Sequence, residues 1–252
     1  MKKLLLLALL FISALTFAKP GKPVETPEFI LKNYDNFFSY LKTHYKPNQD
    51  LIAYDVNGKM IGKAMFFEKL ITSKYLPVRL YGEDGKLYYK LHRMTAGQSK
   101  DMGGYISGYA NSWAGNYRKE GKRFPAFNFV DLNGIKYNTA NTKGKVLVVK
   151  CWFIGCQLCE KEMPELNALK ARYKSRKDIV FISLAPDSKT KLQAFLKRKR
   201  FDYPIIPSQD NFMVKQLGIT EYPTHLIVNK QGMVVNVVND PEEIEWALQH
   251  KI

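Results

Sequence analysis

The stretch of sequence that decides the fold is Val146-Leu147-Val148-Val149-Lys150-Cys151-Trp152-Phe153-Ile154-Gly155-Cys156-Gln157-Leu158-Cys159. Its first half is an apolar run rich in β-branched residues, which is typical of a strand buried on both faces. The run ends at Gly155, and the residues that follow Cys159 are amphipathic, as expected for a helix. The sequence therefore predicts a buried strand that leads into a helix N-terminus, with a CxxC motif at the junction.

This position predicts a reactive thiol. Cys156 would lie at the helix N-terminus, where free backbone N–H groups and the helix dipole stabilise an anion. Both effects lower the pKa of a thiol below its ordinary value of about 8.5. A spacing of three places Cys159 on the same face of the first helical turn, within reach for a disulfide. We predict that Cys156 attacks a disulfide and that Cys159 resolves the product.

Two other interpretations of the motif are weighed against redox catalysis. A zinc site would need further ligands, for which Cys151 and His225 are candidates, but no second ligand pair follows at zinc-finger spacing. An inert structural disulfide is disfavoured because CxxC loops are strained and tend to be labile and catalytic. The motif therefore favours a dithiol that works without a metal or an organic cofactor.

Residues 1–18 have the three parts of a secretory signal peptide. A basic start with Lys2 and Lys3 precedes an apolar core at residues 4–15, and Thr16-Phe17-Ala18 forms a small-x-small cleavage site. The core is too short to span a bilayer comfortably, and a retained membrane anchor is the alternative. We expect an exported protein in an oxidising compartment, where a partner must keep the motif oxidised or reduced.

The chain is strongly basic, with a formal net charge of +16. Such a charge suits nucleic acid, anionic lipid or acidic protein partners. We expect no nucleic-acid partner, because the protein is predicted to be exported and carries no recognisable nucleic-acid-binding motif. The densest basic run, residues 197–200, closes a helical pattern. We interpret it as a solvated helix end, with peripheral contact to an anionic envelope surface as the alternative.

The chain divides near residue 122, and residues 19–122 are predicted to form a smaller α+β region. No element is predicted for residues 97–121, and no catalytic constellation is found in this region; His44 and His92 are interpreted as ordinary residues. The predicted elements are, in order, a helix at 27–45, a strand at 51–55, a short helix at 66–70 and a hairpin formed by 78–81 and 86–92.

Residues 123–252 are predicted to form one βα unit after another. A right-handed crossover would make the strand at 179–185 parallel to the buried strand. Asp240 followed by Pro241 predicts a helix start. The other predicted elements are hairpins at 124–137 and 224–238, the buried strand at 146–154, one continuous helix at 156–176, a helix at 188–200, a strand at 203–206 and a helical turn at 213–217.

Residues 123–252, about half of the chain, resemble the TlpA-like thiol-disulfide oxidoreductases that bacteria export. The resemblance implies a thioredoxin-like central mixed sheet flanked by helices, preceded here by the smaller α+β region. It also implies a location in the periplasm or cell envelope of a bacterium. The stretches that carry it are Phe124-Pro125-Ala126-Phe127 before Asp131-Leu132-Asn133-Gly134, Gly144-Lys145-Val146 before Trp152, residues 156–166, and Gly218-Ile219-Thr220-Glu221-Tyr222-Pro223-Thr224.

The resemblance implies roles for individual residues and kinds of partner. It makes Cys156 the nucleophile, Cys159 the resolving thiol and Pro223 a cis-proline that faces them. A cis bond at Pro223 would leave the backbone of Tyr222 free to pair with an extended substrate. The implied partners are protein disulfides and a membrane or periplasmic electron donor. The residues expected to contact the substrate are Tyr222, Pro223, Thr224 and Trp152.

Lys150 departs from the family pattern, because thioredoxins carry a buried aspartate there that moves protons for the resolving cysteine. A lysine with its ordinary pKa of about 10.4 cannot take over that role. Glu162 matches a glutamate that many family members place beneath the active site. We predict that Lys150 and Glu162 form an ion pair there; the alternatives are that Lys150 reaches solvent and that Glu162 is only an exposed helix acid. Cys151 is predicted to be a buried, inert thiol.

The leading hypothesis is an exported reductase of protein disulfides. The same cysteine pair would act as an oxidase if its reduced form were strongly stabilised. A thiol peroxidase of the peroxiredoxin type is a second hypothesis, but it needs a proline and a threonine around its cysteine, and the turn before Cys156 has neither. A third hypothesis makes residues 19–122 an envelope-binding module to which the thioredoxin domain is an accessory.

Overall fold

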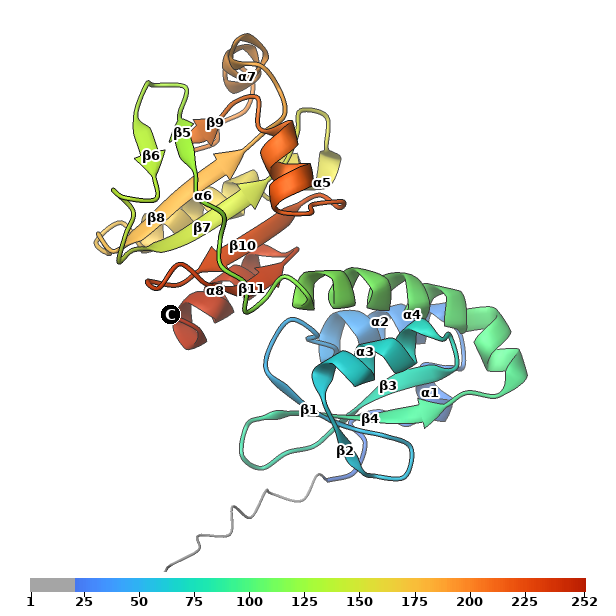
Figure 1. Ribbon diagram of the computed structural model, residues 1–252. Coiled ribbons are helices and arrows are strands. Elements are labelled where there is room, and N and C mark those ends of the chain that lie inside the picture. Colours follow the sequence, from blue (N-terminus) through green and yellow to red (C-terminus); the bar gives the residue numbers. More distant parts are fainter. Residues whose placement is uncertain (1–20) are drawn as a thin grey trace, which may run out of the picture.

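The computed structural model describes residues 21–252, so the predicted signal peptide lies outside the described residues. Figure 1 shows two bodies, one built from the N-terminal part of the described chain and one that ends at the C-terminus. Their hydrophobic cores are separate clusters of buried side chains. No helix within residues 21–252 combines the length and the apolar composition needed to cross a bilayer.

The first body holds a four-stranded sheet with the strand order β2-β1-β4-β3. β1 and β4 are parallel, whereas β3 and β4 form the predicted antiparallel hairpin. Helices lie along one side of the sheet in Figure 1. The elements are α1 (Pro27–Ile30), α2 (Tyr34–His44), β1 (Leu51–Tyr54), β2 (Met60–Ile61), α3 (Lys63–Ile71), β3 (Tyr75–Leu80), β4 (Leu87–Arg93) and α4 (Ala96–Tyr117).

Two helices of this body differ from the prediction. The helix expected at 27–45 is interrupted between α1 and α2, because the Asn33 side chain accepts the Asn36 N–H and caps a new helix. α3 extends over Lys63–Ile71, beyond the five residues predicted at 66–70. Phe66, Phe67 and Leu70 bury the face of α3 that packs into the core.

The 22-residue helix α4 occupies a stretch for which no element was predicted. It contains five glycines, which lower helix propensity and blur the amphipathic pattern. Tertiary contact explains one of them, since a Cβ on Gly103 would lie 2.4 Å from the Ser73 carbonyl oxygen. A capping box formed by Thr95 and Gln98 starts the helix. In Figure 1 the far end of α4 reaches the edge of the second body at β11.

The second body is built on a five-stranded mixed sheet with the strand order β11-β10-β7-β8-β9. β7, β8 and β9 are parallel, and β10 runs antiparallel to both β7 and β11. This is the thioredoxin-like sheet implied by the resemblance. The strands of the sheet are β7 (Val146–Cys151), β8 (Ile179–Leu184), β9 (Ile205–Ile206), β10 (Thr224–Val228) and β11 (Val234–Val238).

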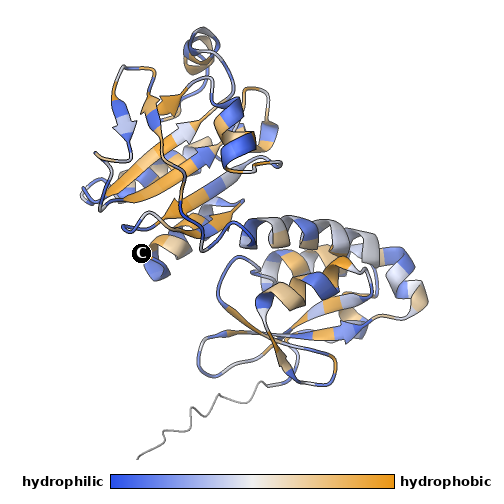
Figure 2. Cartoon of the chain, in the orientation of Figure 1, coloured by the Kyte–Doolittle hydropathy of each residue, from blue (hydrophilic) through white to orange (hydrophobic). Residues whose placement is uncertain are grey.

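Helices cover this sheet, and its strands form the apolar centre of the body in Figure 2. Every residue of β7 is buried, as predicted for a strand covered on both faces. The remaining elements are the β5 (Asn128–Val130) and β6 (Lys136–Asn138) hairpin, α5 (Gln157–Lys161), α6 (Met163–Arg172), α7 (Lys189–Leu196), the short π-helix η1 (Phe212–Gln216) and α8 (Pro241–His250).

The helix predicted at 156–176 is broken into α5 and α6 at Glu162. Pro164 explains the break, because it has no N–H to donate and its ring crowds the preceding turn. The strand predicted to reach residue 154 ends at Cys151, and the helix predicted to reach residue 200 ends at Leu196. The break matters for the site, since it places Glu162 at a helix junction directly after the CxxC turn.

Candidate active site

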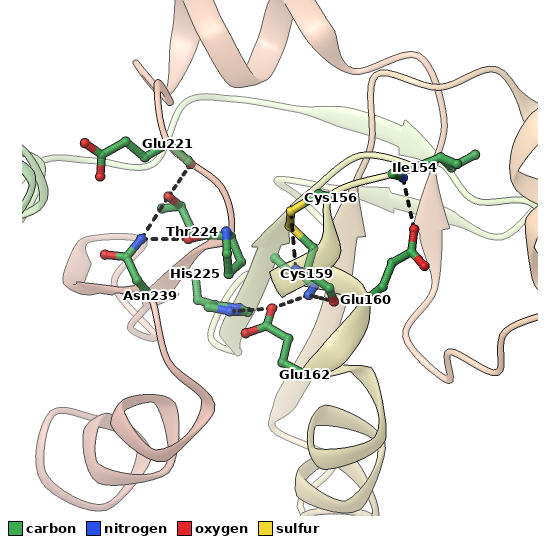
Figure 3. Close-up of a disulfide and its surroundings, with 12 residues drawn as sticks. Ile154, Cys156, Cys159, Glu160, Glu162, Glu221, Thr224, His225 and Asn239 are labelled. Carbon is green, nitrogen blue, oxygen red and sulfur yellow. Dashed lines mark hydrogen bonds and ion pairs between the residues drawn. A yellow bond between two sulfur atoms is a disulfide. The ribbon is translucent and has the colours of Figure 1, made fainter. Parts of the chain in front are cut away.

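The two cysteines of the motif lie at the start of α5 and are joined by a disulfide. Cys156 is the N-cap residue, and its sulfur accepts the Cys159 N–H at 3.3 Å. Cys156 is 8% exposed, whereas Cys159 has no exposed surface. Of the two cysteines only Cys156 keeps exposed surface, and Figure 3 shows the disulfide that joins them.

Two carboxylates hold the loop that precedes Cys156. The Ile154 N–H donates to Asp187 Oδ2 at 2.9 Å, and the Gly155 N–H donates to Glu160 Oε1 at 3.0 Å. Gly155 has a φ of +95°, a left-handed conformation that favours glycine. Backbone donors next to the nucleophile are thus occupied by acids of the protein itself.

Lys150 lies beneath the disulfide with no exposed surface. Its ammonium forms an ion pair with the Glu162 carboxylate and donates to the Cys159 carbonyl oxygen at 3.0 Å. The predicted ion pair is present, and the alternative in which Lys150 reaches solvent is wrong. Lys150 therefore ties Glu162 to the backbone of the resolving cysteine.

His225 completes this group, although the sequence suggested it only as a zinc ligand. It is fully buried on β10, directly opposite Lys150 on β7, and its Nε2 lies 3.1 Å from Glu162 Oε1 (Figure 3). Within residues 21–252 no group of three or more His, Cys, Asp and Glu side chains is arranged to hold a metal ion. The pairing of β10 with β7 is the signal that identifies His225, and this pairing is not visible in a local pattern.

Burial and mutual contact decide the charges of these groups. Burial opposes ionisation of Glu162, but the neighbouring His225 and Lys150 outweigh it and lower the pKa of this carboxyl. Burial lowers the pKa of His225 below 6.5, although Glu162 acts in the opposite direction, so its ring is neutral at pH 7. The result is a Lys150–Glu162 ion pair with a neutral imidazole beside it.

Cys151, the third cysteine, lies next to Lys150 on β7 and is free and fully buried. Burial raises the pKa of its thiol to about 12, although Lys150 acts in the opposite direction. At neutral pH this thiol is protonated and out of reach of solvent. The structure therefore agrees with the prediction of an inert core cysteine.

The Tyr222–Pro223 bond is cis, as predicted. The Tyr222 ring contacts the ring of Phe153, with centroids 5.3 Å apart in an edge-to-face arrangement. This contact joins the proline loop to the segment that leads into the CxxC motif. Tyr222 is half-buried, whereas Pro223 is buried like Thr224, and substrate contact by Tyr222 and Pro223 stays a prediction.

Trp152 and Thr224 are placed differently from what the resemblance implied. Trp152 has no exposed surface and packs in the core against Phe195 and Phe201. The Thr224 side chain is also buried and donates to the Glu221 carbonyl oxygen at 2.7 Å. We correct the prediction for both side chains, because core packing leaves them no surface on which a substrate could bind.

The first body contacts the proline loop through α4. Ser112 donates to the Glu221 carboxylate. Asn116 donates to Asn239 Oδ1 at 2.7 Å, and Asn239 Nδ2 in turn donates to the Pro223 carbonyl oxygen at 2.6 Å. The sequence offered no hint of these contacts, because α4 itself was not predicted.

The mixed sheet, the cis-proline and a CxxC disulfide at a helix N-terminus define a thiol-disulfide oxidoreductase with a thioredoxin-like fold. A family model described as Redoxin matches residues 119–249, and the chain belongs to this family. The resemblance drawn from the sequence is thereby confirmed.

Several proteins that are similar to this chain are named thiol-disulfide oxidoreductases. The chain is 30% identical over 126 residues to the thiol-disulfide oxidoreductase ResA of Bacillus thuringiensis subsp. konkukian, covering 50% of this chain and 72% of that protein. It is 28% identical over 120 residues to ResA of Bacillus subtilis, covering 47% and 66%. A crystal structure of a putative thiol-disulfide oxidoreductase from Bacteroides vulgatus is 26% identical and covers 53% of this chain and 96% of its own, with a TM-score of 0.48.

Proposed function

We propose that this protein is an exported reductase of protein disulfides. Cys156 and Cys159 would pass two electrons to a substrate disulfide and become oxidised to the disulfide seen in the structure. The support for export is the leader-like pattern of residues 1–18. The bacterial relatives named above support the redox chemistry and leave its direction open.

The surroundings of Cys156 bear on the direction of electron flow. A dithiol pair is a strong oxidant when its reduced thiolate is strongly stabilised. Here Asp187 and Glu160 occupy the N–H groups just before Cys156 and place negative charge nearby. Within residues 21–252 the Cys159 N–H is the one backbone donor to the Cys156 sulfur. These two carboxylates oppose the stabilisation of the thiolate by the helix N-terminus and by Lys150, and they are the observation that carries the proposal of a reducing pair.

The first step is attack on the substrate. The Cys156 thiolate attacks one sulfur of the substrate disulfide and forms a mixed disulfide, while the other substrate sulfur leaves as a thiolate and takes a proton from water. The backbone of Tyr222, which precedes the cis bond to Pro223, would pair with the extended substrate chain. The contact of Tyr222 with Phe153 holds this loop against the segment that leads to the nucleophile.

The second step is resolution of the mixed disulfide. Glu162 would accept the Cys159 proton, directly or through one water, and the Cys159 thiolate would then attack the Cys156 sulfur. The second substrate sulfur leaves as a thiolate, so the substrate has gained two electrons. Lys150 and His225 act as positioning residues in this step, because they hold the Glu162 carboxylate ionised under Cys159. A donor dithiol in the membrane or periplasm would then reduce the pair again.

The reduction potential tests the proposed direction. We expect the Cys156/Cys159 pair to equilibrate in a dithiothreitol series near the potential of thioredoxin, about −270 mV. A potential near that of a strong oxidant, about −120 mV, would contradict the proposal and indicate an oxidase.

Alkylation and trapping test the assigned roles. Reduced protein should be alkylated first at Cys156 at mildly acidic pH, because Cys159 and Cys151 are fully buried. The Cys159→Ser variant should accumulate mixed disulfides with substrate proteins, whereas Cys156→Ser should trap none. Preferential labelling of Cys159 would reverse the two roles.

A further inference from the structure

A groove of about 670 Å³ lies where α4 of the first body meets the proline loop of the second. Residues from the end of α4 form one wall, and residues 215–221 form the other. Leu226 of β10 and Val234 of β11 also contribute to its lining. The groove is therefore built by both bodies and does not exist in either alone.

The charged side chains that line this groove are mostly cationic. Its cationic side chains are Arg118, Lys119, Lys122, Arg123 and Lys215, and its one carboxylate, on Glu221, is already bonded to Ser112. No ion pair joins any of the five cations to a carboxylate of residues 21–252.

The hydrogen bonds of these cations go to neutral backbone carbonyl oxygens. Lys119 donates to the Gly115 carbonyl oxygen at 3.0 Å, and Arg123 donates to the Gln231 carbonyl oxygen at 3.1 Å. Burial and the neighbouring Arg118 lower the pKa of Lys119, Glu221 acts in the opposite direction, and Lys122 again lowers it. Such a crowd of like charges is stabilised by an anion.

The position of the groove relates it to the redox site. Glu221 lines the groove, and in Figure 3 its carboxylate points away from the disulfide. The next residue, Tyr222, packs on Phe153 on the side of the CxxC motif. The two sites therefore lie on either side of one loop, along which an extended substrate chain would run.

We infer that this groove binds an acidic segment of the substrate protein, close in sequence to the disulfide that Cys156 attacks. The inference rests on the proposed function as a reductase of protein disulfides. Carboxylates suit the site because arginine and lysine side chains form charge-assisted hydrogen bonds with them. A polypeptide is favoured over a lipid surface, because the charges line a concave groove beside the loop along which a substrate strand must lie.

Binding of labelled peptides to the full chain tests the inference independently of the redox step. The probes are three ten-residue peptides that lack cysteine and carry a block of four Glu, four Gln or four Lys. At low salt the Glu peptide should bind at least tenfold more tightly than the Gln peptide in fluorescence anisotropy. The difference should vanish in about 0.5 M salt, because screening weakens exposed charges.

Two charge-matched variants separate the groove from the overall charge. The groove variant Arg118→Gln, Lys122→Gln, Lys215→Gln should bring the Glu-to-Gln affinity ratio close to one. The distal variant Arg198→Gln, Lys174→Gln, Lys197→Gln removes the same charges from exposed positions outside the groove and should keep the ratio. All three groove positions are exposed, so the fold should tolerate the changes.

The same peptides with a disulfide beside the block distinguish the two proposals. Reduced protein should react at least tenfold faster with the Glu peptide than with the Gln peptide. Tight binding of the Glu block without any disulfide reduction would contradict the reductase function and leave the groove assignment standing. The groove assignment would be overturned if the Glu, Gln and Lys peptides bound equally. It would also be overturned if the distal variant lost the Glu-to-Gln affinity ratio as fully as the groove variant. Binding to phosphatidylglycerol vesicles in place of the Glu peptide would also overturn it.

Discussion

At the scale of single residues, Lys150 is the least expected feature of the site. A cation on a strand that is buried throughout is strongly unfavourable unless it is paired. Lys150 has both a carboxylate partner in Glu162 and a carbonyl partner in Cys159. The pair therefore holds a charged carboxylate inside the core, where a proton acceptor for the resolving thiol is needed.

We predict that Glu162→Gln slows the resolving step by about a hundredfold, the usual loss when a general base is removed. Because the folded-state pKa of Glu162 lies below 4.5, the parent protein should keep a full rate down to that pH and lose it as the pH falls through the folded pKa. Stability from this group is lost over the same range. Single-turnover quenched flow, extended to as low a pH as the fold tolerates, measures the step.

The matched control for this prediction is Glu165→Gln, on the exposed face of the following helix. It removes one carboxylate from the same region without touching Lys150 or His225. Its rate and pH profile should follow the parent. If Glu162→Gln also resolves at the parental rate over the whole range, Glu162 is a structural residue and another group or water accepts the proton.

At the scale of elements, α4 forms because packing overrides a weak helix propensity. Gly103 allows α4 to approach the turn before β3, with Ser73 in direct contact. Gly104, its neighbour in the same helix, faces open space. The structure therefore has room for a side chain at position 104 but not at position 103.

We predict that Gly103→Ala destabilises the protein by about 1–3 kcal/mol, because the added methyl group would collide with the backbone of Ser73. Gly104→Ala should stabilise it by up to about 1 kcal/mol, since alanine is the better helix former. Urea unfolding followed by circular dichroism gives both free energies. Equal effects of the two substitutions would mean that α4 is not held by this contact.

At the scale of the whole molecule, polar side chains join the two bodies. Asn236 on β11 is fully buried and donates to the Asn48 carbonyl oxygen and to Glu120 Oε1, each at 2.8 Å. Asn48 in turn donates to the Glu243 carboxylate at 3.0 Å. The contacts of α4 with the proline loop belong to the same interface. The basic groove therefore keeps its shape only while this interface between the two bodies is intact.

Removing the amide of Asn236 should weaken this interface. We predict that Asn236→Ala lowers the free energy of unfolding by about 1–3 kcal/mol, because the buried Asn48 carbonyl oxygen loses this donor and Glu120 Oε1 keeps only the Val237 N–H. Asn211→Ala, at an exposed position, should change it by less than about 0.5 kcal/mol. Urea titrations of both variants measure the difference. A stability of Asn236→Ala equal to that of the parent would show that water replaces the amide at this interface.

The amino-acid sequence by itself determined the parts of the protein whose chemistry is local. The β7 run, the CxxC motif after Gly155 and the proline at position 223 lie in short segments, where periodicity and neighbouring residues carry the information. These segments were sufficient to predict the strand, the helix start and the burial of Cys151, and the family resemblance that they carry implied the cis bond. The pairing of Lys150 with Glu162 was also within reach, because both positions are close to the motif.

Only the tertiary structure decided which distant residues meet. His225 joins Lys150 and Glu162 because β10 pairs with β7 in one register, and a shift of a single residue would turn its side chain to the other face of the sheet. Trp152 is withdrawn from the surface by packing against α7 and the segment after it. The basic groove requires α4 to lie against the proline loop, about a hundred residues further along the chain. Contacts of this kind depend on long-range packing, which no local pattern of residues encodes.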